Sequence, residues 1–306
     1  KKEIAFSNMN EITCPESLYS DSEEKIHYDS PFFPLYLREE LISAFRHQRA
    51  EAHFHKDLEY ILIKKGRLGY EVNGQSYVLE EGEGIFVNSM ALHFGYAIEH
   101  AECDFLCLLF PPYLLANCPA VEENMLTPYL HKESALLLKK DSPVLRELEA
   151  LSQERNTPSP DPLLYSALLF RLWGKTLPLF SKEEAGRQSN SLTLVKMALA
   201  YVKAHYSEDL SLSSFASALS ISSSLLTKLF RNYLHDSPMD YVSSYRLSLA
   251  AERLKTSDES VKTIALSSGF RSANFFARSF KKKYGVSPKS FRAERPLGHV
   301  EESLPS

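Results

Sequence analysis

Three histidines and a glutamate stand at spacings that favour a shared binding site. His53 and His55 are two residues apart in the run HFHKDLEYILIKKG, and Glu59 follows four residues later. In an extended strand these three side chains point to one face, because successive side chains alternate between the two faces. His93, in the later run GEGIFVNSMALHFGY, is the fourth candidate. Imidazole and carboxylate groups in one place suit either a first-row divalent metal or hydrogen bonds to a small polar ligand.

The same stretch resembles the metal-holding motifs of the cupin fold. The likeness covers roughly residues 45–110; its first motif is close, whereas the second has Asn88–Ser89 where cupins often have proline. The resemblance implies a barrel in which the metal ligands are His53, His55, Glu59 and His93.

Three interpretations of these four residues remain open. The first is a cupin metalloenzyme, which requires a divalent metal at the four side chains. The second is an effector pocket, in which they hydrogen-bond a sugar or another small polar metabolite and no cofactor is required. The third is a set of satisfied polar groups with a structural role alone. The type of domain attached to the barrel decides between them.

The elements that must position these residues read as short strands. From about Phe45 to Phe110 the apolar pattern has a period of two, and Asn73–Gly74 marks a hairpin turn. Strands this short and closely spaced predict an all-β sandwich or barrel.

Beyond Pro111–Pro112 the apolar spacing becomes helical, in the runs YLLANC, SALLLKK, PVLRELEALSQERN and DPLLYSALLFRLWGKTLPLF. Asp161 stands at an N-cap position with Pro162 in the first turn of the last helix. That helix contains Trp173, the only tryptophan, and its apolar surface belongs either to the core or to a dimer contact.

Charge divides the chain into two unequal parts. From Asn190 to His299 there are 16 Lys and Arg against 8 Asp and Glu, a net charge of +8. The whole chain has 35 Lys and Arg against 39 Asp and Glu. The rest of the chain therefore has 19 basic against 31 acidic residues, a net charge of −12. An acidic body with a basic C-terminal third predicts that the latter meets a polyanion.

Within the basic third, Val261–Pro288 reads as two short helices joined by a turn at Ser268–Gly269. The second helix has an apolar stripe of Phe275, Phe276, Ser279 and Phe280 that we expect to face inward, and a polar, cationic outer face. A helix, a glycine turn and a cationic helix predict a helix-turn-helix, which inserts its second helix into the major groove of DNA.

A second copy of this pattern lies about 50 residues upstream, in LSLSSFASALSISSSLLTKLFRNYLHDSP. The two copies end alike, in LFRNYLHDSP and SFKKKYGVSP, and a long helix connects them. Two such units on one rigid helix can read two successive segments of the major groove, about 34 Å apart.

The C-terminal hundred residues resemble the DNA-binding domain of the AraC/XylS transcription regulators. The resemblance is carried by YRLSLAAERL in the connecting helix and by IALSSGFRSANFFARSFKKKYGVSPKSFR. It implies seven helices with two helix-turn-helix units, and control of promoters in response to small molecules. It also implies that DNA faces Ser224, Thr227 and Lys228 of the first reading helix and Ala273, Asn274, Ala277 and Arg278 of the second.

Side-chain chemistry supports part of that set. Arg278 offers a bidentate fork to guanine, and Asn274 can pair with adenine. Arg231, Lys281 and Lys282 suit phosphate contacts, which position a protein without specifying sequence. The first reading helix, SSSLLTKLF, is poor in large polar side chains, so we expect the second helix to discriminate between bases.

The remaining features exclude other classes. No run of about 18 apolar residues exists, which excludes a membrane span. The four cysteines form no CxxC pair, so we interpret them as reduced thiols of a cytoplasmic protein. They are Cys14, Cys103, Cys107 and Cys118.

The sequence therefore predicts a two-domain regulator. We expect an all-β, cupin-like effector domain (1–110), a helical extension suited to dimerisation (111–180), a linker (181–191), an all-α AraC-type DNA-binding domain (192–295) and a tail (296–306). The expected partners are promoter DNA, a small effector, RNA polymerase and a second copy of the chain. The DNA-binding domain favours the effector pocket over the cupin metalloenzyme, because a DNA reader uses a ligand-sensitive shape.

Overall fold

The computed structural model describes residues 26–29, 33–45, 48–130, 132–157, 161–181 and 190–293. It falls into two compact units that divide between Lys196 and Met197. Most of the expected linker and the whole expected tail lie outside the described residues, so the domain boundaries remain predictions.

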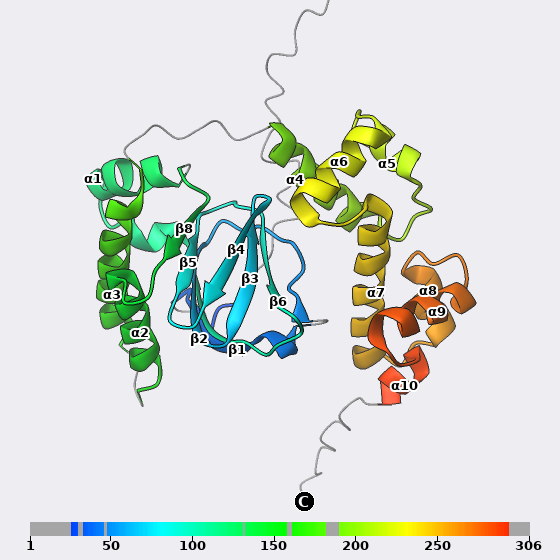
Figure 1. The fold of residues 1–306 in the computed structure, drawn as a ribbon, viewed down its shortest axis with the longest axis horizontal. Coiled ribbons are helices and arrows are strands. Elements are labelled where there is room, and N and C mark those ends of the chain that lie inside the picture. Colours follow the sequence, from blue (N-terminus) through cyan, green and yellow to red (C-terminus); the bar gives the residue numbers. More distant parts are fainter. Residues whose placement is uncertain are drawn as a thin grey trace, which may run out of the picture. The chain divides into compact units, whose positions relative to one another are not determined.

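The N-terminal unit is built on two antiparallel sheets (Figure 1). The five-stranded sheet has the order β1-β7-β2-β5-β8, and the three-stranded sheet has the order β4-β3-β6. This arrangement confirms the predicted all-β domain. The strands are β1 (Tyr36–Leu41), β2 (Leu58–Lys65), β3 (Arg67–Val72), β4 (Gln75–Glu80), β5 (Gly84–Val87), β6 (His93–Ala97), β7 (Asp104–Phe110) and β8 (Ala135–Leu138).

The predicted hairpin turn joins β3 to β4. Asn73 and Gly74 have φ angles of 51° and 82°, and Val72 pairs with Gln75 across the turn. Two successive positive φ angles match the right-handed twist of the flanking strands, and Asn-Gly is the dipeptide that adopts them most readily.

One expected helix is a strand. The run SALLLKK was predicted to be helical, but Ala135–Leu138 forms β8 and pairs with β5, from Gly84↔Leu138 to Val87↔Ala135. Four consecutive apolar residues do not distinguish a helix from a strand, and the free edge of β5 offers backbone hydrogen bonds that local sequence cannot reveal. The region 111–180 is therefore not helical throughout.

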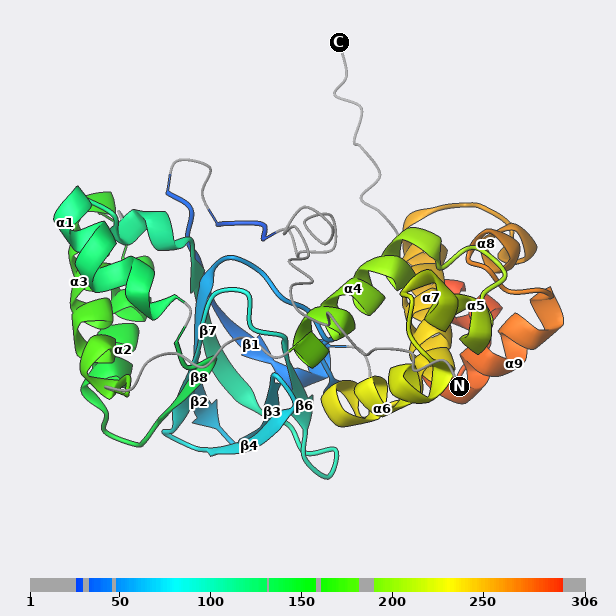
Figure 2. The same cartoon turned by 90° about the horizontal axis from the view of Figure 1, so that it is seen from above.

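Strand β2 is buried on both faces, which explains its continuous apolar run. Ile61 and Ile63 belong to the core between the sheets, whereas Tyr60 and Leu62 belong to the core under α2 (Pro143–Arg155) and α3 (Pro162–Thr176). Figure 2 shows these two helices beside the five-stranded sheet. Glu59 has the parity of Ile61, so it faces the space between the sheets.

Helix α3 begins as predicted, because Asp161 accepts a hydrogen bond of 2.8 Å from the backbone nitrogen of Leu163. Trp173 is 2% exposed and belongs to the core, while Leu163 is 79% exposed. Short elements connect β7 to the helices. They are η5 (Pro112–Leu115), α1 (Pro119–Val121), the π-helix η6 (Glu122–Leu126) and η7 (Thr127–Tyr129); η3 (Ile42–Ala44) and η8 (Leu177–Leu179) lie elsewhere.

The described C-terminal residues, 190–293, form seven helices, as the family resemblance implied. Figure 1 shows the long helix α7 with one pair of short helices near each end. The helices are α4 (Asn190–His205), α5 (Leu212–Ala218), α6 (Ser223–Leu234), α7 (Pro238–Thr256), α8 (Val261–Ser267), α9 (Ala273–Tyr284) and α10 (Pro288–Ala293).

Helices α5 and α6 form one helix-turn-helix unit, and α8 and α9 form the other. Ser222 and Ser272 occupy equivalent N-cap positions, and each accepts a hydrogen bond from the third residue of its helix. The residue with a positive φ differs between the two turns: Gly269 has a φ of 84°, whereas Ser220 in the first unit has a φ of 56°. A Cβ atom on Gly269 would lie 2.4 Å from the carbonyl oxygen of Tyr206, so this position requires glycine.

Aromatic side chains hold each unit together. In the first, Phe215 and Phe230 meet edge to face with centroids 5.8 Å apart. In the second, Phe276 and Phe280 are fully buried against Leu254 of α7. Among the helices that the structure describes, none has both the length and the apolar character needed to cross a membrane.

Candidate ligand site and nucleic-acid interface

The four predicted barrel residues come together. Their potential ligand atoms lie within 4.8 Å of one another. Glu59 comes from β2 and His93 from the start of β6, while His53 and His55 precede β2. Only His53 pairs with a strand, through hydrogen bonds of 3.1 and 2.9 Å to the backbone of His93. The expectation that both histidines lie on a regular strand was therefore wrong, although the single bridge brings His53 to His93.

Each histidine is oriented through the same ring atom. The Nδ1 atoms of His53, His55 and His93 lie 2.7, 3.1 and 2.8 Å from the backbone carbonyl oxygens of Glu51, Asp57 and Ala91. A carbonyl oxygen only accepts, so Nδ1 carries a proton in each ring. The Nε2 atom of each ring is therefore the one left for a metal or another ligand.

Glu59 is the carboxylate of the cluster. Tyr70 donates a hydrogen bond of 2.7 Å to its Oε1 atom, and its Oε2 atom lies 3.3 Å from His55 Nε2 and 2.7 Å from His93 Nε2. The His93 contact is short, yet His93 Nε2 makes no hydrogen bond of acceptable geometry and is fully buried. Burial opposes ionisation of Glu59, but His93 and His55 outweigh it and hold the pKa of Glu59 well below its usual range.

These residues fit a first-row divalent metal. Three imidazole nitrogens and one carboxylate are donors that such ions accept, and hydrogen bonds from the other ring nitrogen to carbonyl groups are typical partners of metal-binding histidines. The buried Nε2 atom of His93, close to Glu59 but not aligned for a hydrogen bond, supports this fit.

A cavity of about 240 Å³ lies next to the cluster, and His53 and Glu59 form part of its wall. Most of the other lining side chains are apolar, and the polar exceptions include Tyr36, which donates a short hydrogen bond to Glu40. The apolar part of the lining includes Ile42, Ile61, Leu68, Phe105 and Leu109.

The predicted DNA-facing residues of the second unit lie on one side of α9. Asn274 and Arg278 are exposed and are four residues apart, so they share a helix face. Neither side chain has a hydrogen bond or ion pair within the described residues. Ala273 and Ala277 are half-buried beside them, and Lys281 and Lys282 are exposed further along the helix.

The first unit presents a smaller polar surface. Ser224, Lys228 and Arg231 are exposed on α6, whereas Thr227 is half-buried. The Thr227 hydroxyl donates a hydrogen bond of 2.8 Å to the carbonyl oxygen of Ser223 in its own helix. Only the lone pairs of this hydroxyl therefore remain for an outside donor.

One residue of the expected inward stripe faces outward. Phe275 is 52% exposed, whereas Phe276 is fully buried. Consecutive residues are 100° apart on a helix, so a core at Phe276 and Phe280 leaves Phe275 at its margin. Leu225, the equivalent residue of α6, is 37% exposed. Both reading helices therefore expose an apolar side chain three residues after the N-cap serine.

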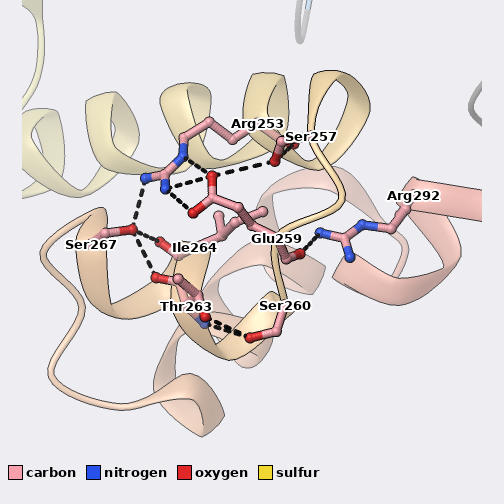
Figure 3. Close-up of polar contacts among 8 residues, drawn as sticks. All are labelled: Arg253, Ser257, Glu259, Ser260, Thr263, Ile264, Ser267 and Arg292. Atoms are coloured by element: carbon pink, nitrogen blue, oxygen red, sulfur yellow. Dashed lines mark hydrogen bonds and ion pairs between the residues drawn. The ribbon is translucent and has the colours of Figure 1, made fainter.

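A polar network ties the second unit to α7 (Figure 3). Arg253 donates to both carboxylate oxygens of Glu259, at 2.8 and 2.6 Å, and to Ser267 of α8 at 2.7 Å. Arg292 of α10 donates a hydrogen bond of 2.6 Å to the backbone carbonyl oxygen of Glu259. The network joins three helices and orients the unit that presents α9.

Two supporting side chains escaped the sequence interpretation. Tyr70, which orients Glu59, belongs to the alternating pattern of a strand whose partner the sequence does not reveal. Lys283, which follows Lys281 and Lys282 on α9, donates a hydrogen bond of 2.9 Å to the carbonyl oxygen of Ser244 on α7. Lys283 lies seven residues after Phe276 and three after Phe280, and this helical spacing could have indicated that it lies on the side of α9 that faces the core.

Comparisons with known proteins match both units of the chain. A family model for an AraC-like ligand binding domain matches residues 39–173, and a model for a helix-turn-helix domain matches residues 215–294. The helix-turn-helix regulator YdeC of Bacillus subtilis (strain 168) is 23% identical over 254 residues, which cover 78% of this chain and 85% of YdeC. The transcriptional activator RhaS of Klebsiella pneumoniae (strain 342) is 26% identical over 255 residues, which cover 79% and 87% of the two chains.

A third relative, the raffinose operon regulatory protein RafR of Pediococcus pentosaceus, is 28% identical over 130 residues, covering 42% of this chain and 47% of RafR. These relatives and domains indicate a transcriptional regulator rather than an enzyme. The chain belongs to the AraC family of transcription regulators, with an AraC-like ligand-binding domain followed by a helix-turn-helix DNA-binding domain.

Proposed function

We propose that this regulator binds a promoter through α6 and α9 and that a small molecule in the barrel cavity controls this binding. The observation that carries the DNA interface is the pair Asn274 and Arg278, exposed on one helix face without partners in the described structure. Such side chains can form bidentate hydrogen bonds with adenine and guanine. Lys281, Lys282 and Arg231 add positive charge for phosphate contacts.

The effector site is proposed at His53, His55, Glu59 and His93 and in the cavity beside them. A concave, mostly apolar space with a few convergent polar groups is the usual form of a small-molecule site. The sequence suggested a sugar-like effector because the cluster is rich in donors and acceptors. The aliphatic lining favours instead a ligand with an apolar body, since a sugar would leave most of its hydroxyl groups unpaired there.

The same four side chains are also proposed to hold a divalent metal as part of the effector site. When bound, such an ion supplies positive charge and open coordination positions to a ligand in the cavity. His53, His55 and His93 would coordinate through Nε2, and Tyr70 would hold the carboxylate of Glu59 in place.

Control by the effector would follow from a population shift. A ligand changes DNA affinity only as far as it binds one state of the protein better than another. Dimerisation through the exposed apolar residues of α3, such as Leu163 and Leu164, and contact with RNA polymerase are part of the same proposal. RhaS of Klebsiella pneumoniae is a transcriptional activator, and this motivates activation as the expected outcome.

Binding of the full chain to duplexes selected from a random library tests the DNA interface. Affinity should fall steeply between about 50 and 200 mM salt, because phosphate contacts release counterions. An Asn274→Ala/Arg278→Ala double variant should keep its fold and lose selectivity among duplexes. Selection of no duplex, or binding without salt dependence, would contradict the proposal.

A further inference from the structure

The cavity and the histidine cluster together define a class of effector. We propose that the effector is a small organic monoanion that ligates a metal held by the cluster and places an apolar body in the cavity. This inference rests on the proposed function, in which the barrel binds the effector and the cluster holds a divalent ion.

The first observation is which side of the cluster is accessible. Of the four residues, His53 and Glu59 line the cavity, and His55 and His93 are 2% and 1% exposed. First-row metals commonly take more than four ligands, so four protein donors leave positions for another molecule. A molecule in the cavity meets the cluster at His53 and Glu59, and it completes the coordination from that side.

The second observation is charge. An imidazole that coordinates a metal through Nε2 is neutral, so once the ion is bound Glu59 brings the only charge of the donor set. A divalent ion then gives the site a net charge of +1. A buried positive charge without a partner is costly, and an anionic ligand removes that cost. A neutral ligand of the same shape does not.

The third observation is the apolar character of the rest of the cavity wall. Aliphatic and aromatic side chains make up most of it, so it favours an apolar body. It also carries Glu40, whose carboxylate accepts the hydroxyl hydrogen of Tyr36. A second carboxylate on the ligand would meet Glu40 and be repelled, which favours a single anionic group.

The size of the cavity bounds the ligand. Its volume of about 240 Å³ lies below the range of roughly 300–1,000 Å³ typical of sites for drug-sized molecules. A hydroxy or oxo carboxylate with a short aliphatic chain or one ring satisfies the size, the charge and the lining together.

Cobalt(II) and two anions test the proposal on the full chain. Protein freed of metal with a chelator is titrated with cobalt(II), whose visible absorption reports its ligands, and then with azide or salicylate. Azide is small enough to report an open coordination position whatever the cavity shape, and salicylate adds an apolar ring. Salicyl alcohol is the neutral match for salicylate.

We expect one cobalt(II) ion per chain, a changed spectrum with azide and with salicylate, and binding of salicylate at least about tenfold weaker without metal. Salicyl alcohol should leave the spectrum unchanged. The His93→Ala variant should lose cobalt(II) and both anions. The Leu68→Phe variant, which fills the cavity without altering a ligand, should keep cobalt(II) and azide and lose salicylate.

Three results would overturn the inference: cobalt-loaded protein that binds neither anion, azide binding without salicylate binding, or equal binding of salicylate to protein with and without metal. These comparisons use the wild-type chain, so they stand even if a variant does not fold. Binding to the selected duplexes is measured on the same preparation, and its loss would reject the DNA interface while leaving the cobalt results to judge the effector class.

Discussion

The Arg246 side chain on α7 donates a hydrogen bond of 2.6 Å from Nε to the carbonyl oxygen of Tyr206, which follows α4. Its Nη2 atom donates a hydrogen bond of 2.6 Å to the carbonyl oxygen of Glu208. Gly269 of the second unit packs against both Tyr206 and Arg246. Burial lowers the pKa of Arg246, although the guanidinium stays charged. One side chain thus links the segment leading into the first unit to the turn of the second.

We expect Arg246→Ala to relax the spacing between the two DNA segments that the protein reads. Without the guanidinium, the carbonyl groups of Tyr206 and Glu208 lose their donor, and the orientation of the second unit relative to the first is held less tightly. Duplex selection with wild-type protein should return one fixed separation, near one helical turn. Selection with the variant should return several.

Glu252→Ala, an exposed substitution on the same helix, is the matched control and should keep the wild-type spacing. A fixed spacing in the Arg246→Ala variant would show that α7 alone sets the distance.

Arg278→Ala should cost about 1–3 kcal/mol of binding at the preferred duplex and relax the base preference at one position. Lys281→Ala should weaken binding to all duplexes by a similar factor and reduce the salt slope by about 1, because a phosphate contact carries no sequence information. Competition among single-base variants of the selected duplex, at two salt concentrations, distinguishes these outcomes. A uniform loss for Arg278→Ala would make it a phosphate contact.

Phe275 and Phe276 are neighbours with opposite expected effects. Phe276→Ala should destabilise the C-terminal unit by about 3–5 kcal/mol, because Phe276 is fully buried. Phe275→Ser should leave the unfolding temperature nearly unchanged and reduce the preference for thymine, whose methyl group an exposed apolar side chain can contact. Thermal unfolding and duplex competition measure the two effects. Unchanged base preference in Phe275→Ser would show that this ring faces solvent in the complex.

The Arg253–Glu259 pair makes a pH-dependent contribution to stability. Hydrogen bonds from Arg253 hold the pKa of Glu259 below its usual value. Ionised Glu259 therefore stabilises the folded chain above the unfolded-state pKa of about 4.3, and this contribution is lost as the pH falls through the lower, folded-state pKa. Glu259→Gln should unfold at a lower temperature than wild type at pH 7, and the difference should shrink at acid pH. A difference that stays constant would point to packing instead of charge.

The sequence by itself determined both domains and most of the local structure. The Asn73–Gly74 turn, the Asp161 cap and the turn at Gly269 follow from backbone preferences of single residues, which act without tertiary context. The repeated layout of helix, turn and second helix, with the like endings LFRNYLHDSP and SFKKKYGVSP, was sufficient to predict the two helix-turn-helix units. The residue types and spacing of His53, His55 and Glu59 also indicated a shared site, although the regular strand expected at the two histidines is not formed.

Only the tertiary structure decided the remaining features. Ala135–Leu138 became a strand because β5 offered an unpaired edge, and Phe275 faced outward because Phe276 and Phe280 already filled the core. The proton on Nδ1 of the three histidines depends on the carbonyl groups of Glu51, Asp57 and Ala91. The hydrogen bonds of Arg246 likewise depend on the carbonyl groups of Tyr206 and Glu208. Backbone carbonyl groups are common to all residue types, so a sequence cannot show which of them a side chain will meet.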